Sequence, residues 1–401
     1  MPALASRLKE ITPSASVVMT AKARELAAKG VKVISLAVGE PDFATPDHAI
    51  EAAHQAALAG QTKYPPQDGT LALKQAVQRK FRRDNQLDYA LDEIMVANGG
   101  KQIIMNGLLA TIDPGDEVLI PSPFWISYAD MAKLAGGTVV NIPCPQNNGF
   151  KLRPEDLEAA ITPRTRLLFL NVPSTPTGAA CSRAEMQALA DVLLRHPHVW
   201  VLSDDMYEHL VYDPFEFCTI AQVEPRLKDR VLTVNGASKT YAMTGWRIGF
   251  CGAPKALIKA MVNMQGQLTG GTSTVGQAAA AAAALDGPQD LVAERAAIYR
   301  ERRDLVVDML NQAPGIACHK PEGAFYVFPN VAGCLGRTSA GGRLIETDAD
   351  FALALLEEKH VAVVHGAAYG MSPYVRISYA TDTASLREAC ARIQEFCHGL
   401  T

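Results

Sequence analysis

Short apolar runs alternate with helical patterns through most of the chain, and this alternation constrains the fold more than any other feature. Short buried strands are predicted at residues 116–121, 138–142, 166–170, 199–203 and 231–234. Between two of them, Ser182 followed three residues later by Glu185 predicts a helix start with a capping box. Alternating strands and helices predict an α/β fold, with a mostly parallel sheet covered by helices on both faces.

Composition limits the possible classes of protein. A chain of 401 residues has room for a large core and more than one domain. A net charge of −4 without a Lys/Arg block argues against a nucleic-acid or membrane partner. No apolar run approaches the roughly 20 residues needed to span a bilayer, and the N-terminus lacks the apolar core of a signal peptide. Eight scattered cysteines predict reduced thiols, a cytoplasmic location and no metal site.

The segment from Gly236 to Gly249 carries the strongest chemical pattern. Lys239 follows an apolar run and is surrounded by small residues, so a flat, bulky group can approach its backbone. A lysine in such a pocket can lose its proton and form a Schiff base with an aldehyde. Arg247 offers a planar fork for a phosphate. An aldehyde that carries a phosphate suggests pyridoxal 5′-phosphate (PLP).

The pattern Ser-Lys-(x)5-Gly-Trp-Arg-Ile-Gly, which begins at Ser238, resembles the lysine motif of the class I and II aminotransferases of PLP fold type I. Further landmarks follow in the family's order from about residue 11 to residue 380, and they most resemble the bacterial aspartate aminotransferases with their aspartate/prephenate relatives. The resemblance implies a large PLP-binding domain at residues 46–292. It implies a smaller α/β domain built from residues 1–45 and 293–401, which a charged helical pattern near residues 293–310 would enter.

The resemblance assigns further residues to the cofactor. Asp204, at the end of a predicted strand, would pair with the pyridine nitrogen, and Tyr207 would donate to the phenolic oxygen. The turn Gly99-Gly100-Lys101 would present backbone N–H groups to the phosphate at the start of a helix. The other assignments are Trp125 stacked on the ring, Ser238 and Arg247 beside the cofactor, and Tyr64, which would serve the partner subunit of a homodimer.

Substrate residues follow from the same resemblance. Arg376, inside a predicted strand, would bind the α-carboxylate with its fork, and the backbone of Gly39 would lie over the substrate. Lys101, with Ser14 or Ser16, would meet a distal carboxylate. Trp125 and Thr175 complete the set. A lysine in this position favours an acidic amino acid, with L-aspartate as donor and 2-oxoglutarate as acceptor.

Two segments depart from the family pattern. Thr175 stands where the family's Asn-Pro-Thr-Gly has asparagine, and a hydroxyl offers one donor where an amide offers two. We expect weaker support for the cofactor's phenolic oxygen, a raised Schiff-base pKa and weaker α-carboxylate binding. The loop at Gly270-Gly271 is smaller and freer than the Ser/Thr-rich run usual there. It either admits a different side chain or is a neutral change.

The resemblance implies ping-pong transamination, with Lys239 as the Schiff-base lysine and then the general base. Three alternatives stay open. The first is an aminotransferase for prephenate or another unusual amino acid, and the second is a lyase or decarboxylase on the same fold. The third is a non-enzymatic PLP-binding regulator, which would need an appended DNA-binding segment or a missing lysine.

Overall fold

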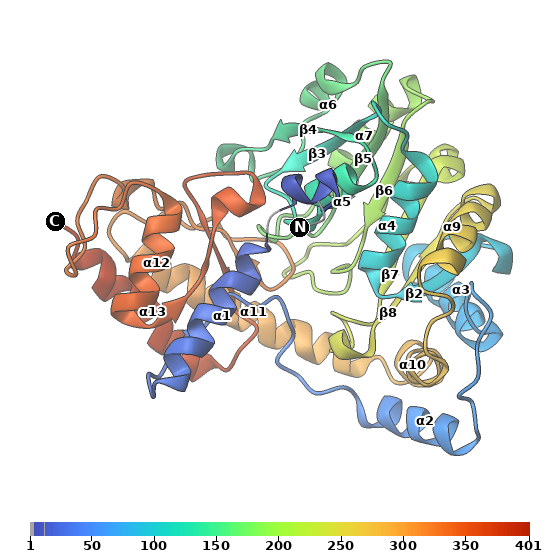
Figure 1. Ribbon diagram of the computed structural model, residues 1–401, viewed down its shortest axis with the longest axis horizontal. Helices are drawn as coiled ribbons and strands as arrows, with labels where there is room; N and C mark the ends of the chain where they lie inside the picture. The colour runs from blue at the N-terminus through green and yellow to red at the C-terminus, as the bar shows by residue number, and fades with distance from the viewer. Residues whose placement is uncertain (1–3, 12) are drawn as a thin grey trace.

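The computed structural model describes residues 4–11 and 13–401, and its largest element is a seven-stranded sheet (Figure 1). The strand order is β2-β8-β7-β6-β5-β3-β4, and β8 alone runs against its neighbours. The predicted mostly parallel sheet is therefore confirmed. Its strands are β2 (Ile94–Asn98), β3 (Glu117–Ser122), β4 (Thr138–Pro143), β5 (Thr165–Asn171), β6 (Trp200–Asp204), β7 (Val231–Gly236) and β8 (Ile248–Gly252).

Helices cover both faces of this sheet. Successive strand residues point to opposite sides, so Ile94 and Val96 of β2 join one apolar core while Met95 and Ala97 join another. The first core is closed by α3 (Leu71–Asn85), α6 (Pro154–Ala160) and α7 (Arg183–Arg195), with α2 (Asp47–Leu58), α8 (Ile220–Val223) and α10 (Thr274–Ala278) at its margins. The second is closed by α4 (Gly100–Thr111), α5 (Ser127–Leu134) and α9 (Lys255–Leu268).

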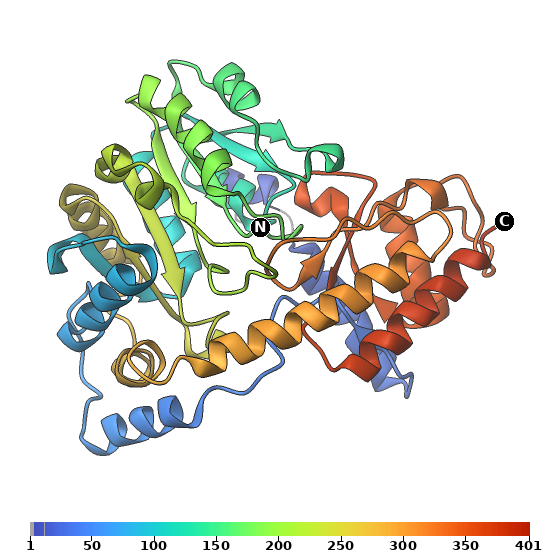
Figure 2. The same cartoon turned by 180° about the vertical axis from the view of Figure 1, so that it is seen from behind.

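A second, smaller group of elements surrounds a third apolar core, which also includes Met206, Tyr207 and Leu210 from the loop after β6. The long helix α11 (Asp290–Asn311) leads from the sheet to the C-terminal helices α12 (Asp348–Lys359) and α13 (Thr383–His398), as Figure 2 shows. Helix α1 (Ala15–Ala28) packs there through Met19 and Ala23. The strands are β1 (Ile34–Ser35) paired with β10 (Val361–Ala362), and an antiparallel set of β11 (Val364–His365), β12 (Val375–Ser378) and β9 (Tyr326–Val327).

Local sequence signals explain where several elements begin and end. The Ser182 hydroxyl accepts from the Glu185 N–H at 3.3 Å, and the Glu185 carboxylate accepts from the Ser182 N–H at 2.7 Å, which is the predicted capping box. Among the described residues, no helix is both long and apolar enough to cross a membrane. The parallel strands β5, β6 and β7 end at one edge of the sheet, where open α/β sheets hold ligands.

Candidate active site

A cavity of about 680 Å³ lies at this edge of the sheet, between the two groups of elements. It is lined by the end of β6, the loop after β7 and the start of α4, and across from them by α1 and β12. Most of the residues predicted from the sequence line it: Ser14, Ser16, Gly39, Gly100, Lys101, Trp125, Thr175, Asp204, Tyr207, Ser238, Lys239, Arg247 and Arg376. Gly99 and Tyr64 are not among the lining residues.

Lys239 lies in the loop that follows β7, and its amine points into the cavity. The Nζ atom donates to the Gly39 carbonyl at 2.5 Å. Burial, with a smaller contribution from the positive charge of Arg376, lowers the pKa of Lys239 to about 8, while Glu40 opposes the shift. A larger share of the amine is therefore neutral near pH 8 than in an exposed lysine, which is the state required for attack on a carbonyl.

Asp204 ends β6 with its carboxylate buried in the cavity wall. Burial raises the pKa of this carboxyl to about 6, although a hydrogen bond from Tyr128 acts against the shift. The Tyr128 hydroxyl donates to Oδ2 at 2.5 Å, and the Met206 N–H donates to Oδ1 at 3.4 Å. Asn171 fixes the backbone at this point by donating to the Asp204 carbonyl at 2.9 Å. Asp204 is thus held in place as an acceptor for a buried cation.

The start of α4 and Arg247 together form an anion-binding corner. Gly99 adopts a φ of 86°, and a Cβ there would collide with the Arg247 guanidinium. The same guanidinium donates to the Thr244 carbonyl at 2.9 Å and to the Asn98 carbonyl at 3.3 Å. The free N–H groups at the start of this twelve-residue helix and the arginine therefore face one region. Gly99 serves by allowing this approach, without itself lining the cavity.

Arg376 is a buried cation on β12, with 4% of its surface exposed. Its Nη2 donates to the Ala37 carbonyl at 2.5 Å, and its guanidinium lies over the rings of Tyr326 and Tyr369 at 4.7 and 5.2 Å. Its buried Nε has no hydrogen-bond partner in the protein. Burying an unpaired donor is costly, so this atom marks a place where an anion completes the site.

Lys101 and Trp125 line the same cavity as Arg376. The Lys101 ammonium lies 4.8 Å from the centre of the Trp125 ring, in a cation–π contact. Ser16 reaches the same cavity from α1, where its hydroxyl is 3.5 Å from the Tyr369 hydroxyl. Among the lining residues, five cations face two carboxylates: Arg24, Lys101, Lys239, Arg247 and Arg376 against Glu40 and Asp204. The cavity therefore favours anionic ligands.

Thr175 is buried beside Tyr207. Its backbone N–H donates to the Asn171 side chain at 2.8 Å, and its hydroxyl forms a hydrogen bond with Tyr207. Burial raises the pKa of Tyr207 to about 12, and this hydrogen bond acts against the shift. The Tyr207 hydroxyl is also 2.9 Å from that of Tyr326. The threonine hydroxyl is thus engaged with the tyrosine that the family resemblance places on the cofactor.

Tyr64 is fully exposed and lies away from the cavity. Together with its neighbours in residues 62–65 and with residues 271–275, it lines a surface hollow of about 570 Å³. The glycine pair has a structural reason there: Gly270 has a φ of 71°, and a Cβ on Gly271 would lie 2.6 Å from Pro65 Cγ. The loop at Gly270-Gly271 therefore packs closely on the Tyr64 segment.

Sequence reasoning missed two tyrosines of the site. Tyr128 follows Trp125 by three positions, which places both on one face of the turn that begins α5, and this spacing could have revealed it. No local sequence pattern marks Tyr326, because the residues that it contacts in the site are far away in the sequence. A Cβ on Gly39 would lie 2.6 Å from the Tyr326 hydroxyl, so this ring explains why a glycine is required at position 39.

The comparisons with known proteins agree with this geometry. The sequence model of the family "Aminotransferase class I and II" matches residues 31–393. An aspartate/prephenate aminotransferase from Cereibacter sphaeroides is 56% identical over 401 residues, which cover all of both chains. An aspartate aminotransferase from Rhizobium meliloti is 54% identical over 99% of this chain and 97% of its own.

Solved structures give the same result. The crystal structure of the aspartate aminotransferase from Rhizobium meliloti superposes with a TM-score of 0.97, at 53% identity over the full length of both chains. The Thermus thermophilus aspartate aminotransferase with maleate has a TM-score of 0.92, at 39% identity over 99% of this chain and all of its own. The fold is therefore that of fold type I, as predicted, and the chain belongs to the class I and II aminotransferases.

Proposed function

We propose that this protein is a PLP-dependent aminotransferase that moves the amino group of a dicarboxylic amino acid, foremost L-aspartate, to a 2-oxo acid such as 2-oxoglutarate. One observation carries the proposal. A lysine of lowered pKa, Lys239, shares a single cavity with the buried carboxylate of Asp204 and the incompletely paired guanidinium of Arg376. An amine, a cation acceptor and a carboxylate receptor are what transamination of an amino acid requires.

The residues present fit PLP. The corner formed by Gly100 and Arg247 suits its phosphate, and the buried Asp204 carboxylate suits a protonated pyridine nitrogen. Tyr207 and Thr175 suit its phenolic oxygen, and Ser238 lies beside them in the wall. Bound here, PLP would supply an aldehyde for the amine and an electron sink for the developing carbanion.

The chain's own groups then divide the work. Arg376 binds the α-carboxylate, and Gly39 positions the substrate against Trp125. The Lys239 Nζ takes the proton from the substrate Cα and would deliver it to the C4′ carbon of bound PLP, which suits an amine whose pKa is about 8. Lys101, with Ser14 or Ser16, receives a second carboxylate across the cavity.

A dicarboxylic substrate is supported by the excess of cations in the cavity. The Thermus thermophilus relative was solved with maleate, itself a dicarboxylate. Prephenate is the second candidate, because it also carries two carboxylates and the Cereibacter sphaeroides relative is an aspartate/prephenate aminotransferase. The cavity, about 680 Å³ in volume, has room for either.

The functional unit that we propose is a homodimer with shared sites. Tyr64 is exposed and distant from its own cavity, which suits a residue that serves the partner's phosphate. Residues 46–292 would form the large domain, with residues 1–45 and 293–401 forming the small one; the two cores on the faces of the large sheet lie wholly within residues 46–292. Eight buried free cysteines suit a reducing cytoplasm.

An absorbance spectrum tests the proposal. The purified protein should show a PLP band that depends on Lys239, and L-aspartate without an acceptor should convert it to the pyridoxamine phosphate form. Conversion by prephenate's amino product, and not by aspartate, would favour the second candidate. A band that no amino acid converts would contradict transamination, and a Lys239→Ala protein with full activity would contradict the assignment of the lysine.

A further inference from the structure

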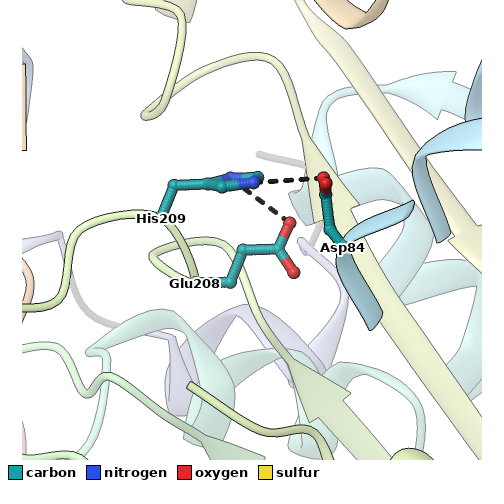
Figure 3. Close-up of side chains that lie close together, drawn as sticks. All are labelled: Asp84, Glu208 and His209. Atoms are coloured by element: carbon teal, nitrogen blue, oxygen red, sulfur yellow. Dashed lines mark hydrogen bonds and ion pairs between the residues drawn. The ribbon is translucent and has the colours of Figure 1, made fainter. Parts of the chain in front are cut away.

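Outside the cavity, a group of charged side chains joins helix α3 to the loop after β6. Asp84, Glu208 and His209 lie together there, as Figure 3 shows. The His209 Nε2 atom is 3.1 Å from Asp84 Oδ2, and its Nδ1 atom is 3.4 Å from Glu208 Oε1. Carboxylates and imidazoles are common metal ligands, so the cations that already pair with these side chains decide whether a metal ion can bind here.

Lysine and arginine side chains already balance the two carboxylates. The buried Lys80 ammonium forms an ion pair with Glu208 and donates to Asn85 at 2.7 Å, while Asn85 donates to Glu208 at 2.7 Å. Arg83 donates to Asp84 at 2.6 and 3.0 Å. Although burial opposes it, hydrogen bonds from His209 and Arg83 hold the pKa of Asp84 well below its usual range. A metal ion here would be repelled by the ammonium, so the cluster is an internal ion network.

This network touches both loops that carry the proposed chemistry. Glu208 and His209 directly follow Tyr207, and the Leu210 N–H donates to the Tyr207 carbonyl at 2.8 Å. On the other side, the His209 Nδ1 atom is 3.3 Å from the Thr240 hydroxyl. Thr240 is buried and is the residue next to Lys239. His209 therefore bridges helix α3 and the lysine loop.

The lysine loop needs such a support. Residues 237–243 contain no helix or strand, and the hydrogen bond from Ala242 N to the Lys239 carbonyl is long, at 3.5 Å. Ala242 also has a φ of 55°, a conformation that non-glycine residues seldom adopt. The remaining anchor of Thr240 is a 3.4 Å hydrogen bond from Arg295 to its carbonyl. Side-chain contacts thus supplement the one shorter backbone hydrogen bond across this loop, from Met243 N to the Ser238 carbonyl at 3.1 Å.

We propose that the contacts Asp84–His209–Thr240, supported by Lys80 and Glu208, form a positioning unit that fixes Lys239 relative to Asp204 and Tyr207. The inference rests on the proposed function, since it requires Lys239 to be the reacting lysine. A displacement of the reacting group by about 1 Å can lower the rate roughly 100-fold. Loss of a hydrogen bond one residue from Lys239 is therefore expected to lower the rate. None of these five residues lines the cavity.

Two substitutions at one position give the sharpest test. Thr240→Val removes the hydroxyl while keeping the shape, and Thr240→Ser keeps the hydroxyl. The matched control is Thr165→Val, which also removes a buried hydroxyl, one that accepts from Thr162 N at 2.8 Å at the remote end of β5. In the PLP-loaded enzyme we expect Thr240→Val to lower kcat about tenfold, change KM less than about twofold and shift the pH midpoint of the bound PLP absorbance. Thr240→Ser and Thr165→Val should keep the parent values.

Parent values of kcat and midpoint in Thr240→Val would overturn the proposal. So would full additivity with His209→Gln, because two residues that act through one contact must couple. Amide hydrogen exchange in the cofactor-free full chain separates this proposal from the proposed function. Faster exchange across residues 237–243 in Thr240→Val supports the contact even if PLP is not the cofactor, and unchanged exchange contradicts it. A parent that shows no Lys239-dependent PLP band would instead overturn the proposed function.

Discussion

The Tyr128 hydroxyl lies 2.5 Å from Asp204 Oδ2 and stabilises the charged form of a carboxylate that burial would otherwise neutralise. Tyr128 of α5 and Asp204 of β6 thus together set the charge at the floor of the cavity.

We expect Tyr128→Phe to raise the pKa of Asp204 further above its ordinary value, because the hydrogen bond that opposes burial is lost. A hydrogen bond to a charged group contributes about 1.5–3 kcal/mol, so kcat near neutral pH should fall at least about tenfold. The acid limb of the kcat profile should move to higher pH. Tyr89→Phe, which loses a buried hydroxyl 3.0 Å from Thr233, is the control. An unchanged acid limb in Tyr128→Phe would contradict the role of this contact.

Thr175→Asn restores the amide of the family pattern. A second donor near the cofactor's phenolic oxygen should lower the pH midpoint of the bound PLP absorbance and lower KM for the amino acid, by about fivefold for one added hydrogen bond. Spectroscopic titration and steady-state kinetics measure both. Thr175→Ser keeps the hydroxyl and should match the parent. Identical titration and affinity in Thr175→Asn would show that the threonine is equivalent to the asparagine.

Lys239 makes stability depend on pH. Its pKa is about 8 when folded, below its ordinary value of 10.5, so the unfolded state binds more protons between these limits. The free energy of unfolding of the cofactor-free protein should therefore rise with pH between about 8 and 10.5. Lys239→Met should stabilise the cofactor-free protein at pH 7 by about 3 kcal/mol, and this gain should shrink by pH 10. Urea unfolding measures it, with Lys259→Met as the surface control; a pH-independent difference would contradict the shift.

Lys101→Met separates acidic from neutral substrates. Loss of a charge-assisted contact of about 1.5–3 kcal/mol should lower kcat/KM for L-aspartate roughly 10- to 100-fold. For L-alanine, which has no second carboxylate, kcat/KM of Lys101→Met should equal the low value of the parent. Equal losses for both amino acids would indicate that Lys101 supports the cofactor or the fold.

Mixed dimers test the sharing of sites. Tyr64→Ala should bind PLP more weakly, and Lys239→Ala should be inactive. When the two variants are mixed and allowed to exchange subunits, one site in each hybrid combines an intact Lys239 with an intact Tyr64 from the other chain. PLP affinity should recover in that site. No recovery in hybrids that native mass spectrometry detects would contradict a shared site.

The sequence predicted the elements whose signals are local. The Ser182–Glu185 capping box marks α7, and the abrupt change from apolar residues to Asp204 marks the end of β6. The two small sheets were mostly missed, because β1, β9, β10 and β11 are two residues long and form only through pairing with strands elsewhere in the chain. Tyr326 was missed for the same reason, since its neighbours Gly39 and Tyr207 are far away in the sequence. The resemblance supplied the site residues, but only the structure reveals what holds them.

Helix α1 contributes Ser16, Thr20 and Arg24 to the cavity wall, yet Met19 and Ala23 are the residues that bury it against the core shared with the C-terminal helices. The chemical side of the cavity, by contrast, is formed at the strand ends of the large sheet, by Asp204 of β6 and by the segment between β7 and β8 that carries Lys239 and Arg247. Evolution can therefore change what the enzyme accepts by altering an exposed helix face, at little risk to folding. Selection for a new amino acid would leave Lys239, Asp204 and Arg247 in place and accumulate its first substitutions in α1.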